Sequence, residues 1–294
     1  IYRSQDSTGD CEVTVYPVFS GIELVYYDVH MQSCDINLAK GREMLIITHC
    51  QEGRIEFEYK NGEYLYLASG DLSIQKNTEN IRHRYCPLSH YHGVSVAIDM
   101  NRVPRCFSCI LDDVFVSHEE LEMKFCSEKP YSIMRENISI EHIFSELYSV
   151  PENIRKGYHK VKVLELLLFL SGLEYKGESE ERRYFSRSQV TAAKEAKKYL
   201  LAHLDEHITI TELADMLGIS STSLKICFKG VYGDTINGYI TNCKMQKAAS
   251  LLKNTDKSVL EIAGIVGYNN GSKFAGAFRR VMNKSPNEYR KSLV

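Results

Sequence analysis

The apolar positions in the last third of the chain repeat twice, each time as a short helix, a glycine and a second helix. The first copy begins with Thr209 and Glu212, and the second begins with Ser258 and Glu261. This spacing is typical of a capping box, in which a hydroxyl and a carboxylate satisfy the free amides at a helix start. The two copies lie about 49 residues apart and predict two helix-turn-helix motifs. The positions that repeat after each box are Leu213, Ala214, Leu217 and Gly218, then Ile262, Ala263, Val266 and Gly267.

The second helix of each copy has one apolar face and one polar face. Leu224 and Phe228 in the first copy, like Phe274 and Phe278 in the second, lie one helical turn apart and are expected to face the core. Short polar side chains near a helix start and basic ones towards its end are typical of helices that contact base edges and phosphates of double-stranded DNA. The residues predicted to bind DNA are Ser221, Thr222, Ser223, Lys225, Lys229, Asn269, Asn270, Ser272, Lys273, Arg279 and Arg280.

Charge is distributed unevenly along the chain. Residues 185–294 contain 16 Lys and Arg against 9 Asp and Glu, a net charge of +7, whereas residues 1–184 contain 20 against 29, a net charge of −9. A basic C-terminal part favours phosphate binding through counterion release, and an acidic remainder discourages wider contact with DNA. The total of −2 therefore conceals an asymmetry that supports the DNA-binding prediction.

The first 130 residues change to a period of two, which predicts β-structure. Residues 54–60 alternate strictly, and Asn61 and Gly62 separate them from a second run at 63–67, so we expect a hairpin with a type I′ turn. Short strands at regular intervals predict a sandwich or barrel. The further strands expected are Glu23–His30, Met44–His49, Leu72–Gln75 and Gly93–Asp99, with a corner at Gly70 and Asp71.

A helical stretch follows the expected strands. One amphipathic helix is predicted because five apolar residues recur at helical spacing, namely Ile140, Ile143, Phe144, Leu147 and Tyr148. Residues 161–170 are apolar on nearly all sides but too short to span a membrane, so this helix needs cover from its own chain or from a second copy. Residues 174–183 have almost no apolar side chains and predict a solvated linker.

The C-terminal motifs resemble those of the AraC/XylS family of bacterial transcription regulators. The resemblance runs from about Ile210 to Arg290 and is most specific at residues 261–268, 272–274, 278–280 and 285–290. It implies seven helices, of which the first covers about Ser188–His203 and a long one over Tyr239–Leu252 joins the two motifs. It also implies a cupin-like barrel that holds a small-molecule effector, and a homodimer formed through helices, with Leu164, Leu167 and Leu168 as candidate contacts.

Three residues depart from the family's usual pattern. Asn283 stands where glycine is usual before the last helix, which is tolerable because Asn also adopts left-handed backbone conformations. Lys273 occupies a position often held by an aromatic residue, so base preference there does not transfer from the family. Gly230 lies near the end of the first motif and is expected to loosen that helix.

The sequence therefore predicts an α+β chain with a cupin-like effector-binding domain at 1–130 and a helical dimerisation or packing segment at 131–175. A linker at 176–187 leads to a double helix-turn-helix domain at 188–294. The predicted function is a sequence-specific transcription regulator controlled by a small-molecule effector, with RNA polymerase as a further partner if it activates. We expect no enzymatic activity, because no nucleotide-binding loop, nucleophile elbow or metalloprotease motif occurs. Activation and repression both stay open.

Two histidines are candidates for an effector site. His49 and His92 share the parity of neighbouring apolar strand positions and are predicted to line the effector cavity. His90 and His92 form a His-x-His, the start of the metal set of enzymatic cupins, but the other ligands are missing at the family's spacing. We therefore predict no metal or cofactor, and a cupin enzyme fused to a DNA anchor is disfavoured.

The cysteines favour a reducing compartment. The chain has 9 cysteines without the spacing of a disulfide framework, and we expect a cytoplasmic location because no secretory leader or lipidation signal is visible. Cys106 and Cys109 form the only close pair. The alternative function is therefore a metal-, haem- or redox-sensing regulator that uses this pair or the group His83, His90 and His92.

Overall fold

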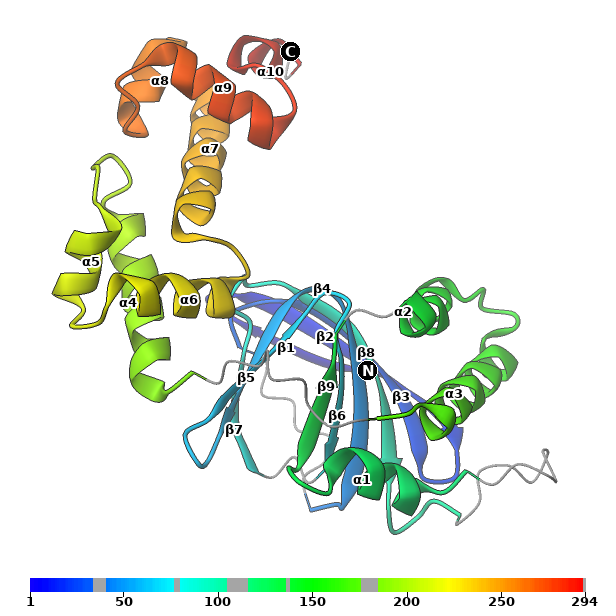
Figure 1. The fold of residues 1–294 in the computed structure, drawn as a ribbon. Helices are drawn as coiled ribbons and strands as arrows, with labels where there is room; N and C mark the ends of the chain where they lie inside the picture. The colour runs from blue at the N-terminus through cyan, green and yellow to red at the C-terminus, as the bar shows by residue number, and fades with distance from the viewer. Residues whose placement is uncertain (34–40, 77–79, 105–115, 136–137, 176–184, 293–294) are drawn as a thin grey trace. The chain divides into compact units, whose positions relative to one another are not determined.

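The computed structural model describes residues 1–33, 41–76, 80–104, 116–135, 138–175 and 185–292. The chain divides into two compact units, Ile1–Tyr184 and Phe185–Val294. The first is built on antiparallel strands with helices on one face, and the second is helical (Figure 1).

Nine strands form the N-terminal unit within the described residues, in the order β1-β2-β3-β8-β4-β6-β9 with β5 and β7 attached to β4. Their bounds are β1 Tyr2–Asp6, β2 Gly9–Phe19, β3 Ile22–His30, β4 Met44–Tyr59, β5 Tyr64–Ala68, β6 Leu72–Lys76, β7 Ile81–Tyr85, β8 Tyr91–Asp99 and β9 Tyr131–Met134. The helices of this unit are α1 His118–Cys126, α2 Ile138–Ser145, the 3-10 turn η2 Glu146–Ser149 and α3 Arg155–Gly172.

Strand β4 belongs to two layers. Its first half pairs with β6 as far as His49 and with β8 as far as Gly53, whereas its second half, from Arg54, pairs with β5 and β7. A bulge between Cys50 and Glu52 and the left-handed Gly53, with φ +80°, separate the halves. Because β4 leaves the main sheet at this bend, the described strands form an open sheet with edges at β1 and β9, and not the closed barrel that the sequence predicts.

The hairpin between β4 and β5 is confirmed, but its predicted turn type is wrong. Tyr59 donates its amide to the carbonyl of Glu63 across a three-residue loop, and the Gly62 amide donates to the carbonyl of Tyr59. Gly62 has φ +85°, whereas Asn61 is not among the residues with positive φ. A type I′ turn needs a positive φ at both of its central residues. The loop is therefore a different turn, closed by one left-handed glycine.

The other expected strands are present, although residues 44–49 are only the start of the longer β4. Strands β1, β2, β7 and β9 were not predicted. The five residues of β1 are all exposed, and β7 is at most half-buried, so neither produces an alternating apolar signal. β1 is a strand because it pairs with β2, and β7 is a strand because it pairs with β4.

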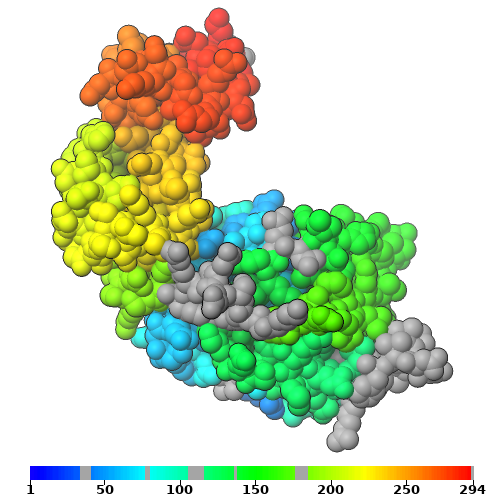
Figure 2. Space-filling view, in the orientation of Figure 1, coloured from blue at the N-terminus to red at the C-terminus, as the bar shows by residue number. Residues whose placement is uncertain are grey.

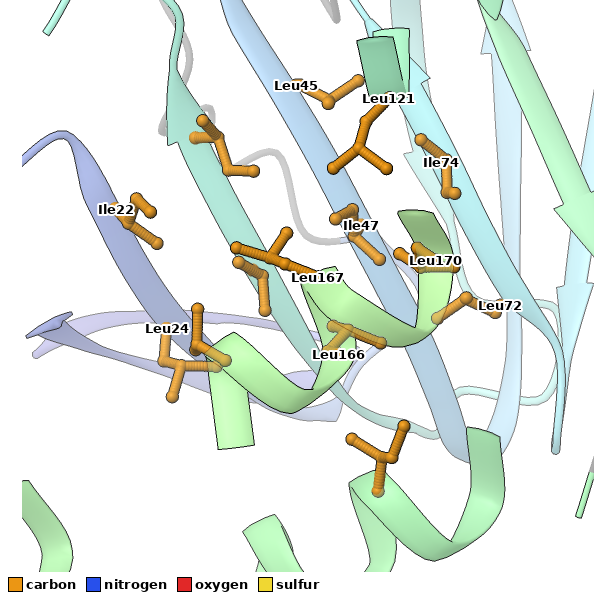
Figure 3. Close-up of a cluster of buried hydrophobic side chains, with 14 of the residues drawn as sticks. Ile22, Leu24, Leu45, Ile47, Leu72, Ile74, Leu121, Leu166, Leu167 and Leu170 are labelled. Carbon is orange, nitrogen blue, oxygen red and sulfur yellow. The ribbon is translucent and has the colours of Figure 1, made fainter. Parts of the chain in front are cut away.

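The main sheet is buried on both faces. One face packs on the layer of β5 and the second half of β4, through residues such as Val13, Val25 and Leu67. The other face carries Leu24, Leu45 and Ile47 and is covered by α2 and α3. Figure 3 shows Leu166, Leu167 and Leu170 of α3 lying over this second face. Burial of each such side chain stabilises the unit by about 1.5–3 kcal/mol.

This packing corrects one predicted dimer contact. Leu167 is only 1% exposed and belongs to the core of its own chain, so it is not available to a second copy. Leu164 and Leu168 are half-buried. Of the apolar residues expected for this helix, Ile140, Ile143, Phe144 and Leu147 are buried as predicted and Tyr148 is half-buried, but the α-helix ends at Ser145 and continues as the turn η2.

Seven helices form the C-terminal unit over residues 185–292, as the resemblance implies. They are α4 Arg187–Ala202, α5 Ile210–Met216, α6 Ser221–Tyr232, α7 Ile236–Asn254, α8 Val259–Ile265, α9 Gly271–Met282 and α10 Pro286–Lys291. Both predicted capping boxes are present, and Leu224, Phe228, Phe274 and Phe278 are completely buried. No helix in the described part of the chain combines the length and apolarity needed to cross a membrane.

We expect protonation of His49 to destabilise the N-terminal unit. This side chain is 4% exposed and stacks on Phe144 with ring centroids 4.6 Å apart. Burial lowers its pKa from 6.5 to about 4. As the pH falls through 6.5 the unfolded chain therefore takes up a proton that the folded unit excludes, which costs about 2 kcal/mol between about pH 7 and pH 5.

In His49→Gln this part of the pH dependence should disappear. Urea unfolding of the native protein and the variant at both pH values measures it, because other titrating groups, such as His159, are common to the two proteins. Equal losses of unfolding free energy in both proteins would show that His49 is not the responsible group.

Candidate nucleic-acid interface

The outer face of α6 is a single polar stripe. Thr222, Lys225 and Lys229 follow one another at one-turn spacing, and all three are exposed. Ser221 and Ser223 are half-buried at the helix start. The Ser223 hydroxyl accepts a hydrogen bond from Nε2 of Gln189 at 3.2 Å, so this predicted DNA contact also fixes α4 to α6.

The outer face of α9 has a similar polarity. Ser272 and Lys273 are exposed at its start, and Arg279 and Arg280 are exposed in its last turn. Asn270 is exposed, and its side-chain oxygen accepts the Lys273 amide at 2.9 Å, so it is the N-cap of this helix. The remaining predicted contact, Asn269, is exposed in the turn. Figure 2 shows the segment that contains α6 in yellow and the segment that contains α9 in orange-red, both on the surface of the C-terminal unit.

The capping boxes fix the start of the first helix in each motif. The Thr209 hydroxyl accepts the Glu212 amide at 3.2 Å, and the Glu212 carboxylate accepts the Thr209 amide at 2.8 Å. Ser258 and Glu261 repeat the pair. These hydrogen bonds lower the pKa of both glutamates, which keeps the carboxylates ionised beside the positive ends of the helix dipoles.

The glycines of the two turns have the same backbone conformation but different surroundings. Gly218 has φ +66° and a Cβ there would meet no atom within 4 Å. Gly267 has φ +77°, and a Cβ there would lie 2.7 Å from the carbonyl oxygen of Asp205 and 3.0 Å from Nζ of Lys244. The turn of the second motif therefore rests directly on the loop between α4 and α5, which belongs to the first half of the domain.

A cation–π contact supports the same junction. Nζ of Lys244, on the joining helix α7, lies 5.7 Å from the ring centroid of Tyr268, next to Gly267. Burial lowers the pKa of Lys244, and Asp205 opposes this shift. The backbone contact at Gly267 and this cation hold the two motifs at one spacing.

Gly230 does not loosen α6, contrary to the sequence prediction. The helix is continuous over Ser221–Tyr232, and a Cβ at position 230 would lie 2.1 Å from the Phe185 ring. Glycine is present there because the aromatic ring packs against the helix backbone. The prediction for Asn283 is confirmed, because this residue ends α9 with φ +57°.

The comparisons with known proteins agree with this architecture. Residues 213–292 match the family model described as a helix-turn-helix domain. The chain is 34% identical over 83 residues to an AraC-like transcription regulator of Streptomyces lividans, over 28% of this chain and 27% of that protein. The C-terminal unit is an AraC-type helix-turn-helix domain. The matched residues contain the second motif in full and the first motif from Leu213 onward.

Two further similarities concern longer or solved proteins. The xylose operon regulatory protein of Escherichia coli K12 is 31% identical over 153 residues, which is 49% of this chain and 39% of that protein. The C-terminal domain of AraT, a response regulator from Geobacillus stearothermophilus, is 32% identical and is matched over 34% of this chain and 84% of its own, with a TM-score of 0.34. The chain thus spans less than half the length of the Streptomyces lividans regulator and of the Escherichia coli xylose operon regulatory protein.

The predicted effector residues lie on the helix-covered face of the sheet. His49 packs under α2, and its Nδ1 lies 3.2 Å from the Tyr148 hydroxyl. His92 is on the same face but near the start of β8, beside His30 and His90. Neither histidine lines the cavity between the two strand layers, which is bordered by Tyr27, Thr48, Gln75, Arg84 and Ser95 among others.

Sequence reasoning missed the residues that set the spacing of the motifs. Asp205 and Lys244 are far from Gly267 in the chain, and a basic residue on a predicted helix is as typical of an exposed face as of a buried contact.

The predicted cysteine pair, Cys106 and Cys109, lies outside the described residues.

We expect Gly267→Ala to destabilise the AraC-type domain more than Gly218→Ala. Both alanines must adopt a left-handed conformation, at about 1–2 kcal/mol each. Only the alanine at 267 also displaces the Asp205 carbonyl. Chemical unfolding of the full chain, followed by far-ultraviolet circular dichroism, compares the two variants. Equal losses would show that the contact with Asp205 does not restrain the second turn.

Proposed function

We propose that this protein is a DNA-binding transcription regulator whose helices α6 and α9 enter successive major grooves of one duplex. The observation that carries the proposal is the pair of exposed polar and basic faces, one in each motif of the AraC-type domain. The net charge of +7 in residues 185–294 favours phosphate contacts, and the relatives are named as regulators.

Within this proposal each face has two groups of residues with different contacts. Ser272 and Lys273 at the start of α9 are placed to reach base edges, whereas Arg279 and Arg280 in its last turn contact phosphates. On α6, Thr222 corresponds to the first group, and Lys225 and Lys229 to the second. Asn270 and Ser223 contribute through the structure of the domain, as helix cap and helix clamp.

We expect Arg279→Ala to weaken duplex binding and to lower its dependence on salt. Loss of one phosphate contact should reduce the slope of log K against log salt concentration by about 0.9. The matched control is Lys253→Ala, which removes an exposed charge from the end of α7. Fluorescence anisotropy with duplex DNA at several salt concentrations measures both. The same slope in Arg279→Ala as in the native protein would place this residue outside the interface.

We further propose that the N-terminal unit binds a small-molecule effector. The cavity between the strand layers has a volume of only about 40 Å³, which is little more than the space of one water molecule. A second cavity of about 230 Å³ lies between the sheet and the helices, and it has room for a small metabolite. It is lined by Thr14, Tyr16, Tyr26, Leu147, Tyr148, Val150, Arg155 and His159.

The chemistry of this second cavity favours an anionic effector. The Arg155 guanidinium lies 5.6 Å from the ring centroid of Tyr16 and is half-buried. The Tyr26 hydroxyl donates to the carbonyl of Leu147 and lies 3.1 Å from Nε2 of His159. Burial, reinforced by Arg155, lowers the pKa of His159, so the imidazole is neutral and Arg155 is the cation of the site.

The position of this cavity provides a route for regulation. Its walls come from β2, β3, η2 and α3, so a ligand that prefers one arrangement of the helices on the sheet shifts the unit towards that arrangement. The outward side of α3, where Val161 is 61% exposed and Leu164 and Leu168 are half-buried, is the proposed contact of a homodimer.

A small carboxylic acid that binds this cavity should raise the melting temperature of the native protein. In Arg155→Met the increase should be lost, whereas Lys156→Met, which removes the neighbouring exposed charge, should retain it. Thermal unfolding with a panel of small carboxylic acids, and with uncharged sugars for comparison, provides the test. An increase that is the same in both variants would place the effector elsewhere.

A further inference from the structure

Three histidines from two distant parts of the chain meet at one end of the main sheet. His30 ends β3, His90 precedes β8, and His92 lies within β8. Each offers one nitrogen, and these three atoms lie within 4.8 Å of one another. The ring centroids are 4.7 Å apart for His90 and His92, 5.0 Å for His30 and His92, and 5.7 Å for His30 and His90.

Strand register brings the histidines together. Asp28 of β3 pairs with His92, so the next side chain on the same face of β3 is that of His30. On the other side of β8, Gly53 of β4 pairs with Tyr91. A Cβ at Gly53 would lie 2.1 Å from the carbonyl oxygen of His90, so only glycine admits the His90 segment this close to β4.

Carboxylates complete the surroundings of the cluster. Oδ1 of Asp28 lies 2.9 Å from Nε2 of His30 and 3.3 Å from Nε2 of His92, and is thus placed between the two rings. Oε2 of Glu52 lies 3.3 Å from Nε2 of His90. Although Asp28 is near, Nε2 of His92 is shielded from solvent and makes no hydrogen bond with any described residue. A nitrogen that is shielded from solvent, makes no hydrogen bond and lies beside two other imidazoles is typical of a ligand position.

The donor set selects the kind of ion. Neutral imidazoles with one carboxylate bind Zn²⁺ and similar divalent transition metals, whereas Mg²⁺ and Ca²⁺ prefer sites made of oxygen atoms. Tetrahedral coordination at about 2.0–2.1 Å places two ligand nitrogens about 3.4 Å apart. The present separations are therefore somewhat too large for coordination. The side chains of His30, His90 and His92 are 52%, 34% and 31% exposed, so small rotations can close the site.

We propose that His30, His90 and His92, with Asp28 as the fourth ligand, bind one divalent transition-metal ion on the helix-side face of the N-terminal sheet. The site is separate from the cavity between the strand layers, because His92 shares its face with Val94 and Val96 of the helix-covered core. It is also separate from His83, which lies on β7 and is not part of the cluster. The ion connects β3 to β8 and, through Glu52 beside His90, reaches the bend of β4.

Titration of the metal-free full chain with Zn²⁺ by calorimetry tests the proposal. We expect one equivalent to bind with a micromolar or smaller dissociation constant, and the affinity to fall about tenfold or more in His30→Ala and in His92→Ala. His83→Ala is the matched control and should bind as the native protein does. Asp28→Asn keeps the shape of the fourth ligand but removes its charge, and it should weaken binding while the circular dichroism spectrum stays unchanged.

Co²⁺ in place of Zn²⁺ identifies the ligands by their absorption. A histidine and carboxylate site should give the visible bands of a four-coordinate ion without a thiolate charge-transfer band, and these bands should be lost in the His30→Ala, His92→Ala double variant. A thiolate band that survives in the double variant would place the ion on cysteines and overturn the proposal. Failure of the native chain to bind one equivalent of either ion would overturn it as well.

Discussion

Strand β8 is the constraint on which the N-terminal unit depends, because it pairs with β3 along one edge and with β4 along the other. This double pairing fixes which residues of three strands share a face. Alternate residues of β8 then contribute to two cores, with Val94 and Val96 under the helices and Tyr91 and Ala97 between the strand layers. A shift of one residue would exchange the two sets, so that neither would fit the core it enters, and the register is therefore strongly specified.

The bend of β4 follows from the same arrangement. Its first half completes the sheet beside β8, and its second half carries β5 and β7 as a separate layer over one face. The opposite face is left for helices, and α3 covers it with leucines (Figure 3). Both the proposed effector cavity and the histidine cluster lie on this helix side of the sheet. The two proposed binding sites of the unit are therefore on one face, the first between the sheet and the helices and the second at the end of the sheet.

The AraC-type domain differs from the N-terminal unit, because the helices, caps and turns that its sequence predicts are those that the structure shows at nearly every position. Capping boxes start the helices, left-handed glycines separate them, and one-turn apolar pairs fill the two cores. Tertiary contacts add the spacing of the motifs. Gly267 rests on the Asp205 carbonyl and Lys244 lies over Tyr268, and neither contact leaves a trace in hydrophobic periodicity. Gly230 is a further example of a tertiary contact without a local signal. Local helix propensity predicts a weak point there, whereas the packing of the Phe185 ring requires glycine.

The sequence by itself determined the elements with local causes: both helix-turn-helix motifs, their caps, the hairpin at Asn61 and Gly62, the amphipathic stretch at 140–147 and the face on which His49 lies. These follow from spacing within one element, where a side chain's partner is a few residues away. Only the tertiary structure decided that the sheet stays open, that Leu167 is in the core, that the exposed β1 is a strand and that His30 joins His90 and His92. Each of these depends on which strand or helix pairs with which. Pairing between distant segments is set by the packing of the whole unit, and no local pattern records it.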